Sequence, residues 1–202
     1  TNLTAVPEVD SLLAELGYNQ NDALVPVELR ILTVDGTDIG YIKVNSNIDD
    51  LNLILRLFER GLQKFEEQKT AGIIIDLRNN SGGVPLGLAG FLTNQDIPLG
   101  QIEYYNSAKG TFETKGEDRK FTAKETQFHF DKIAVLVGLN CASACELEAY
   151  ALGQLPGAVV VGQYPSGGIE AEVSKGQIKM PEGINMQFPT GRIVNQDGSL
   201  FL

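Results

Sequence analysis

The feature that most constrains the fold is the apolar run at residues 72–77, in which three isoleucines follow one another without polar alternation. A strand of this composition is covered on both faces, as are the parallel strands of α/β proteins. Immediately upstream, residues 47–68 place apolar side chains at helical intervals, with Asp49 and Asp50 in the first turn, where acidic groups favour the helix dipole. A helix that leads into such a strand predicts a β-α-β crossover on a parallel sheet.

The same order recurs at residues 133–161, where an apolar strand, a short turn, a helix and a second apolar strand follow one another. Residues 27–44 alternate between apolar and polar around Asp35-Gly36, which predicts an antiparallel hairpin. Residues 101–130 indicate a polar, β-rich insertion, and the chain after Gly162 indicates short strands separated by turns. The predicted fold class is α/β, with a core of β-α-β units, an N-terminal hairpin and a β-rich C-terminal part.

The chain is long enough for one hydrophobic core, since 43% of its 202 residues are hydrophobic. Residues 1–24 carry a short helical pattern (Val9, Leu12, Leu13, Leu16) and are interpreted as a linker or the remnant of a preceding domain. Residues 25–202 form the predicted core domain. The apolar stretch at residues 199–202 is typical of the start of a strand, so we expect this domain to be truncated at its C-terminal end.

The formal net charge of −10 disfavours binding to nucleic acids or anionic membrane surfaces, because it would repel phosphate groups. No apolar run reaches the length of a membrane-spanning helix, and no signal peptide is recognisable. A peptide or an unfolded protein is the expected partner. The sequence gives no indication of the oligomeric state.

The only cysteines, Cys141 and Cys145, lie four residues apart. They are too few for a zinc site without further ligands nearby, and we expect neither a metal nor a cofactor. Their spacing allows a disulfide if the segment turns, which would suit an oxidising compartment, and two buried thiols explain them equally well.

Two loops follow predicted parallel strands, at the sheet edge where reactive groups gather in α/β proteins. Residues 76–83 read DLRNNSGG, and the paired glycines would let main-chain N–H groups turn outward to bind an anion. Residues 139–146 read LNCASACE and place Ser143 before a helix among small neighbours. Each loop alone has an ordinary explanation, since Gly-Gly is common in turns and serine is a common helix cap.

Together, the two loops resemble the DLRNNxGG and ASASE motifs of the tail-specific (C-terminal processing) serine protease family, and the resemblance extends over residues 39–202. It implies a core similar to those of Clp protease and crotonase. It also implies that Ser143 is the nucleophile and that the N–H groups of Ala144 and of Gly82 or Gly83 form the oxyanion hole. The compartment it implies is extracytoplasmic, in a bacterial cell envelope or secreted.

The sequence departs from the best-known members of this family at the general base, because their catalytic lysine corresponds to Gly168 here. Gly167-Gly168 resembles the branch typified by the tricorn protease core, in which a histidine and a glutamate from flanking segments complete a Ser-His-Glu triad. Within the chain, His129, Lys175 and Lys179 are interpreted as ordinary surface or strand residues. We therefore expect the base outside residues 1–202 and little activity from these residues alone.

Three charged residues beside the two loops receive structural interpretations. Asp76 and Arg78 are expected to brace the glycine loop, and Glu146 to complement the dipole of its helix. The leading function is a serine endopeptidase that works through an acyl-enzyme. The alternatives are a non-catalytic peptide- or ligand-binding domain with a degenerate protease fold, and, more weakly, a crotonase-like enzyme acting on acyl-CoA.

Overall fold

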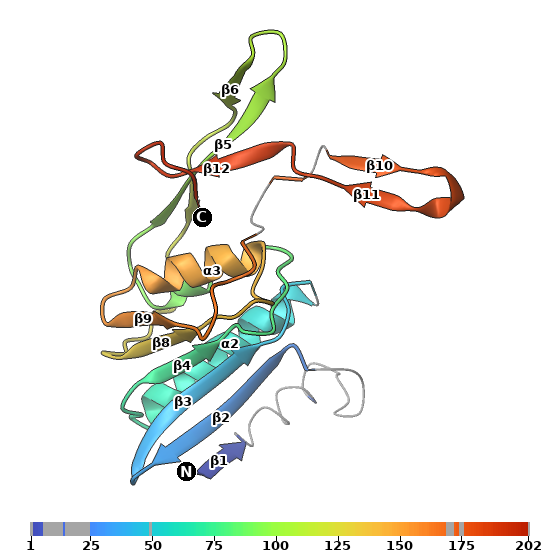
Figure 1. Cartoon of the computed structure of the whole chain (residues 1–202). Helices are drawn as coiled ribbons and strands as arrows, with labels where there is room; N and C mark the ends of the chain where they lie inside the picture. The colour runs from blue at the N-terminus through green and yellow to red at the C-terminus, as the bar shows by residue number, and fades with distance from the viewer. Residues whose placement is uncertain are drawn as a thin grey trace.

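A six-stranded sheet forms the centre of the computed structural model, which describes residues 2–5, 14, 25–48, 50–168, 172–173 and 176–201 (Figure 1). Its strands follow the order β1 (Asn2–Ala5), β2 (Val27–Val34), β3 (Thr37–Val44), β4 (Ile73–Asp76), β8 (Ile133–Leu136), β9 (Ala158–Val161). The sequence did not predict β1, which pairs with β2. The helical pattern predicted from Val9 to Leu16 lies, apart from Ala14, outside the described residues.

The strand directions confirm the predicted hairpin and crossovers. Strands β2 and β3 are antiparallel around the turn at Asp35 and Gly36, whereas β3, β4, β8 and β9 are parallel to one another. Because parallel strands end at one edge of the sheet, the loops after β4 and β8 leave that edge together. These are the two loops in which the sequence predicts the functional residues.

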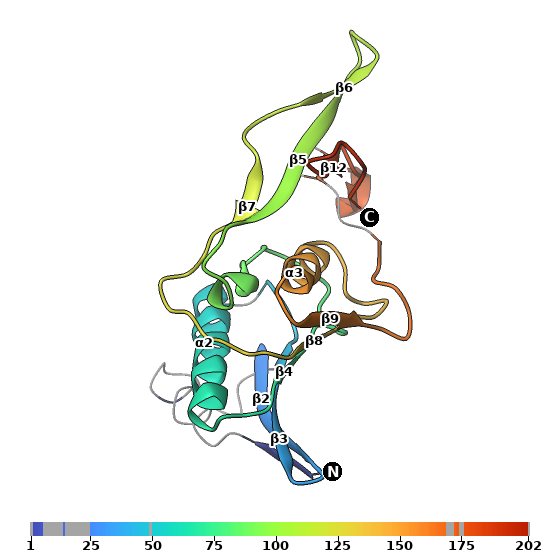
Figure 2. The same ribbon diagram turned by 90° about the vertical axis from the view of Figure 1, so that its left-hand side faces the viewer.

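Helices cover the sheet over these strands, with α2 (Leu51–Glu67) packed on β2 and β3, and α3 (Ala144–Gly153) on β8 and β9. Figure 2 shows α2 running alongside the sheet. The side chain of Asp50 accepts a hydrogen bond from the Leu53 amide (3.1 Å), so it caps α2 instead of lying in its first turn as predicted. Asp49 lies outside the described residues.

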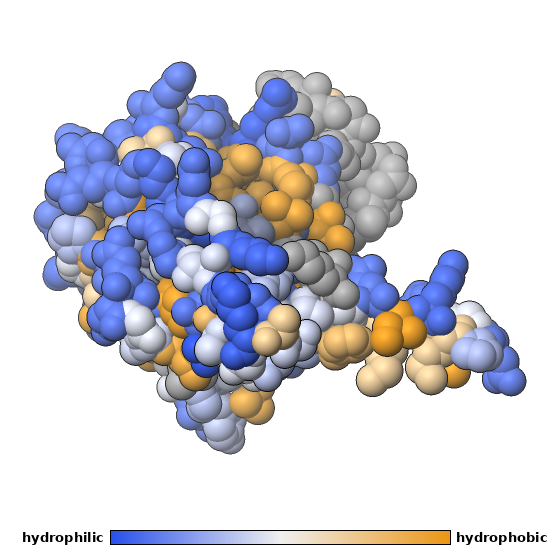
Figure 3. Space-filling model, turned by 90° about the horizontal axis from the view of Figure 1, so that it is seen from above, coloured by the Kyte–Doolittle hydropathy of each residue, from blue (hydrophilic) through white to orange (hydrophobic). Residues whose placement is uncertain are grey.

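The predicted β-rich parts project from this core. A long arm is formed by β5 (Ile97–Asn106), β6 (Thr111–Thr114) and β7 (Arg119–Phe121), with β12 (Gly191–Val194) paired to β5 (Figures 1 and 2). A separate ribbon is formed by β10 (Gln177–Lys179) and β11 (Asn185–Gln187), joined through the 3-10 turn η2 (Pro181–Gly183). In Figure 3 the ribbon extends to the side and shows hydrophobic residues. Those exposed along it are Ile178, Met180, Ile184, Met186 and Phe188.

A short 3-10 helix, η1 (Leu88–Phe91), follows the glycine loop. It contacts both α2 and α3 and closes the core between them. Among the described residues, no helix is both long and apolar enough to cross a membrane.

Asp76 ends β4 and is the most buried charge at the base of the glycine loop. Arg78 donates to both of its carboxylate oxygens (2.9 and 2.6 Å), and the Tyr41 hydroxyl donates at 2.6 Å. Burial raises the pKa of Asp76, but the hydrogen bonds from Arg78 and Tyr41 outweigh it, and the pKa lies below the ordinary value. Burial and the Asp76 carboxylate raise the pKa of Tyr41 to about 12. The expected bracing by Asp76 and Arg78 is therefore present.

The Asp76→Asn variant is expected to lower the free energy of unfolding at neutral pH by about 2 kcal/mol, since a charged hydrogen-bond acceptor is lost. A lowered pKa in the folded state means that the stabilisation is present above the unfolded value of 3.8 and is lost as the pH falls below it. Urea unfolding of both proteins between pH 7 and pH 2.5 tests this expectation. A difference between them that stays constant over this range would contradict it.

Candidate active site

Ser143 lies in the turn between β8 and α3, at the edge where the parallel strands end. Its backbone has φ 54° and ψ −125°, a conformation that side chains with a Cβ rarely adopt. Such strain costs on the order of 1–3 kcal/mol and persists only where the surroundings impose it, often at functional sites. Ser143 is half-buried, and Ala144 begins α3 directly after it, with its N–H at the unpaired start of the helix.

A disulfide between Cys141 and Cys145 spans the serine turn, and their Cα atoms are 5.4 Å apart. Both residues are fully buried. Of the two alternatives that the spacing leaves open, the structure has the disulfide. It closes a short loop with Ser143 at its centre and so restrains the turn.

Removing the disulfide in a Cys141→Ser/Cys145→Ser variant is expected to lower the free energy of unfolding by about 2 kcal/mol, the loop-closure value for so short a loop. Thermal unfolding without reductant measures the loss. Mass spectrometry of denatured, unreduced wild type gives the matching check, since alkylation of both thiols would show that the bridge is absent.

The glycine loop meets the serine turn, as the sequence predicts. The Ala142 amide donates to the Asn80 carbonyl oxygen at 3.3 Å. A Cβ placed on Gly82 would lie 2.5 Å from the Ala142 carbonyl oxygen, 2.9 Å from the Ser143 Cβ and 3.0 Å from the Ala144 nitrogen. Gly82 is therefore packed directly against the serine turn, a contact that only glycine permits.

Two buried asparagines, Asn47 and Asn80, hold the glycine loop in place. Asn80 donates from its side-chain amide to the Asn47 side-chain oxygen (2.7 Å) and accepts from the Gly82 amide (2.9 Å). Asn47 is fully buried, and its carbonyl oxygen leaves no room for a Cβ on Gly83. Because the Gly82 N–H is engaged with Asn80, it is not free to bind an external anion, which leaves the Gly83 N–H as the candidate donor of the pair. The sequence analysis missed Asn47, which no local pattern marks.

A second residue missed in the sequence is the carboxylate of Glu148, which joins α3 to the segment after the glycine loop. It is fully buried and accepts hydrogen bonds from the amides of Leu86 (2.5 Å), Gly87 (2.8 Å) and Leu88 (2.9 Å). Burial raises the pKa of Glu148 above its ordinary value, against the effect of the amide donors. Glu148 therefore holds the start of η1 against the helix that begins at Ser143.

Glu146 does more than complement the helix dipole, which is the role the sequence predicts for it. Its carboxylate accepts from the Ser143 amide (3.0 Å), the Ser166 hydroxyl (2.6 Å) and the Gly168 amide (2.7 Å). The Gly167 amide also donates to the Cys141 carbonyl oxygen (2.7 Å). The turn at residues 166–168 is thus attached to the serine turn.

Of the ionisable candidates for a general base that the structure describes, neither His129 nor Lys179 lies beside Ser143. His129 precedes β8, whereas Ser143 follows it, and the histidine is exposed beside Asp131. Lys179 lies on the projecting ribbon, and Lys175 lies outside the described residues. Gly168 has φ 66°, and a Cβ built on it would face open space.

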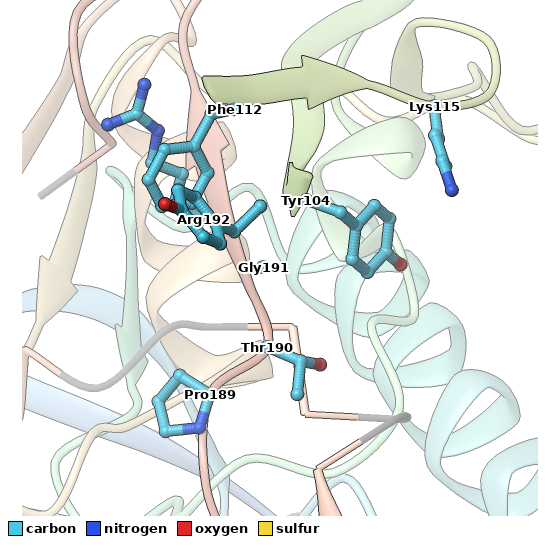
Figure 4. Close-up of a pocket in the computed structure, with 8 residues that line it drawn as sticks. Tyr104, Phe112, Lys115, Pro189, Thr190, Gly191 and Arg192 are labelled. Atoms are coloured by element: carbon cyan, nitrogen blue, oxygen red, sulfur yellow. The ribbon is translucent and has the colours of Figure 1, made fainter. Parts of the chain in front are cut away.

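A separate hollow lies on the β-rich arm between β5, β6 and β12 (Figure 4). Its volume is about 560 Å³, and Tyr104, Tyr105, Phe112, Lys115 and residues 189–192 line it. The Arg192 guanidinium stacks 4.0 Å from the centre of the Phe112 ring and also pairs with Glu103 (2.7 Å). The charges of Arg192 and Glu103 are therefore paired within the arm. None of the residues around Ser143 lines the hollow.

A strained serine between a parallel strand and a helix, beside main-chain N–H groups, is the arrangement of nucleophile turns in α/β hydrolytic enzymes. The chain belongs to peptidase family S41, whose sequence model matches residues 38–201. This finding confirms the family resemblance drawn from the two motifs.

Three relatives illustrate the similarity. A carboxyl-terminal-processing protease of Synechocystis sp. is 33% identical over 129 residues, which cover 63% of this chain and 28% of that protein. The structure resembles the photosystem II D1 C-terminal processing protease with a TM-score of 0.65 and 18% identity over 90% of this chain and 46% of the other. It resembles mature CPAF with a TM-score of 0.65 and 15% identity, over 86% and 47%. The chain thus spans less than half of each relative, and the two solved structures confirm the fold.

Proposed function

We propose that the chain is the core domain of a serine endopeptidase in which Ser143 is the nucleophile. The observation that carries this proposal is the packing of Gly82 against Ser143 and Ala144, which joins two otherwise commonplace loops into one site. Membership of peptidase family S41 supports peptide-bond hydrolysis as the reaction. The substrate would be a peptide or an unfolded protein.

In the proposed reaction, the Ser143 hydroxyl oxygen bonds to the peptide carbonyl carbon and its proton passes to a general base. The carbonyl oxygen becomes an oxyanion that accepts hydrogen bonds from the N–H groups of Ala144 and Gly83. The base then returns the proton to the leaving amine as the C–N bond breaks. Water hydrolyses the resulting acyl-enzyme and regenerates the serine.

The general base is proposed to come from segments outside residues 1–202. Gly168 supports this arrangement, because by comparison of the motifs it corresponds to the lysine of the best-known family members, and a Cβ built on it meets no described atom within 4 Å. The relatives are longer than this chain, so they contain further segments that could supply a base. The same glycine favours the second candidate function, a peptide-binding domain that retains the site but has no base.

A fluorophosphonate probe, which reacts covalently with activated serines, separates these possibilities. We expect the natural full-length chain to be labelled at Ser143, and residues 1–202 alone to react about 100-fold more slowly, the usual contribution of a general base. Equal rates would show that the base lies within residues 1–202. A full-length chain that is not labelled but binds an unfolded peptide would favour the binding domain.

The proposed location is extracytoplasmic. The disulfide between Cys141 and Cys145 supports it, because such bonds form and persist in oxidising compartments.

A further inference from the structure

Glu146 is placed to hold two turns of the candidate site with one carboxylate. Its side chain is nearly buried, at 8% exposure, in the first turn of α3. One oxygen accepts from the Ser143 amide, and the other accepts from both the Ser166 hydroxyl and the Gly168 amide. A carboxylate is a pure acceptor with several lone pairs, so it can satisfy all three donors at once.

The turn at residues 166–168 is fitted to the serine turn by shape as well. A Cβ on Gly167 would lie 3.1 Å from the Ala142 Cβ and 3.2 Å from the Leu139 carbonyl oxygen, so this glycine allows a close approach. The Gly167 amide donates to Cys141, one end of the disulfide that spans Ser143. Polar contacts from three consecutive residues therefore converge on the segment that carries the nucleophile.

The hydrogen bond to Glu146 is made by the strained residue, Ser143, itself. The Ser143 peptide is held in its unusual conformation while its N–H donates to Glu146. The same backbone conformation places the Ser143 Cβ and the Ala144 nitrogen close to Gly82. A role in the helix dipole would need only negative charge near the start of α3 and no contact with Ser166 or Gly168.

We propose that Glu146 is a positioning residue that sets the reactivity of Ser143 by joining the serine turn to the turn at residues 166–168. The inference rests on the proposed function of Ser143. Specifically, Ser166 and Gly168 influence the nucleophile through Glu146. The carboxylate touches no reacting atom and acts through the orientation of the Ser143 peptide.

The chemistry of the carboxylate makes glutamine an informative replacement. Glutamine has the same shape but one accepting oxygen and one NH2 group. In either orientation, the NH2 group faces a main-chain N–H donor, either that of Ser143 or that of Gly168. One of the two attachments is therefore lost without a cavity.

The test uses the natural full-length chain and the rate of fluorophosphonate labelling at Ser143. We expect Glu146→Gln to reduce this rate about 100-fold, the size of effect that a small misplacement of a catalytic group produces. The Michaelis constant for a peptide substrate is expected to stay within about twofold. Glu125→Gln, which removes an equal charge from an exposed loop, serves as the control and is expected to label at the wild-type rate.

A double-mutant cycle with Ser166→Ala distinguishes positioning from general destabilisation. Ser166→Ala alone is expected to slow labelling about fivefold, because Gly168 still donates to Glu146, and to add nothing in the Glu146→Gln background. Independent, multiplying effects of the two substitutions would overturn the proposal. So would a Glu146→Gln protein that labels at the wild-type rate.

Amide hydrogen exchange reports on the attachment without relying on activity. In Glu146→Gln, the amide that faces the NH2 group, either that of Ser143 or that of Gly168, is expected to exchange at least about tenfold faster, as local protection is lost. Unchanged exchange at both amides would overturn the proposal. If the wild type were not labelled at all, the proposed nucleophile would fail, whereas exchange would still decide whether Glu146 joins the two turns.

Discussion

In the natural full-length chain, the Ser143→Ala variant is expected to lose peptide-bond turnover by at least about 10⁴-fold, with the residual rate supplied by binding and by the main-chain donors. Alanine removes the hydroxyl that we propose as the nucleophile and leaves the fold in place, because the small side chain fits the same turn. The positive φ of the residue is retained, so a modest change in stability is expected in either direction.

Cleavage of an unfolded protein, followed by gel electrophoresis and mass spectrometry of the products, measures this loss. Ser107→Ala, in the exposed turn after β5, is the matched control and is expected to cleave at the wild-type rate. Turnover by Ser143→Ala within tenfold of wild type would mean that another residue is the nucleophile. Peptide binding that survives in Ser143→Ala, with cleavage lost, would support a catalytic role over a purely binding one.

Gly82→Ala is expected to have the second-largest effect, at least about a 100-fold loss of turnover, because it displaces the serine turn. The added Cβ would lie 2.5 Å from the Ala142 carbonyl oxygen, closer than real contacts allow, so the two loops must separate. The collision adds to the strain of alanine at φ 92°, and together they are expected to lower the free energy of unfolding by about 2–3 kcal/mol.

Gly116→Ala provides a close control for this substitution. Gly116 has φ 95°, nearly the value of Gly82, but a Cβ there meets no atom within 4 Å. It should lose about 1 kcal/mol from backbone strain alone and retain full turnover. If both variants lost turnover equally, stability and not the meeting of the two loops would explain the effect. If Gly82→Ala retained turnover, the proposed site geometry would be wrong.

The local elements of the fold could be predicted because their causes lie within short stretches of sequence. Apolar side chains at intervals of three and four residues gave α2, and the unalternating isoleucines gave the doubly covered strand β4. The order of helix and strand then restricted the topology, since parallel crossovers follow one hand. The meeting of the glycine loop and the serine turn followed from the same topology, because parallel strands end at a common edge.

The contacts that shape the site could not be predicted in this way, since they join residues distant in the chain. Glu148 reaches Leu86 across 62 positions, and Asn80 reaches Asn47 across 33. In the sequence, Glu146 is an ordinary acidic residue in the first turn of a helix. Its hydrogen bonds to the turn at residues 166–168 are evident only in the structure. The sequence around a carboxylate or an amide does not indicate which distant residue will bind it, because the local backbone conformation is the same with or without that partner.

The sequence by itself therefore determined the β-α-β core, the hairpin, and the two motifs that place the chain in peptidase family S41. Only the tertiary structure decided that Cys141 and Cys145 are bonded, that the Gly82 amide is engaged with Asn80 and that Glu146 joins two turns. The physical reason is the range of the interactions. Periodicity and turn chemistry act over a few residues, whereas hydrogen bonding of buried polar groups is settled only when the packed chain brings donors and acceptors within about 3 Å.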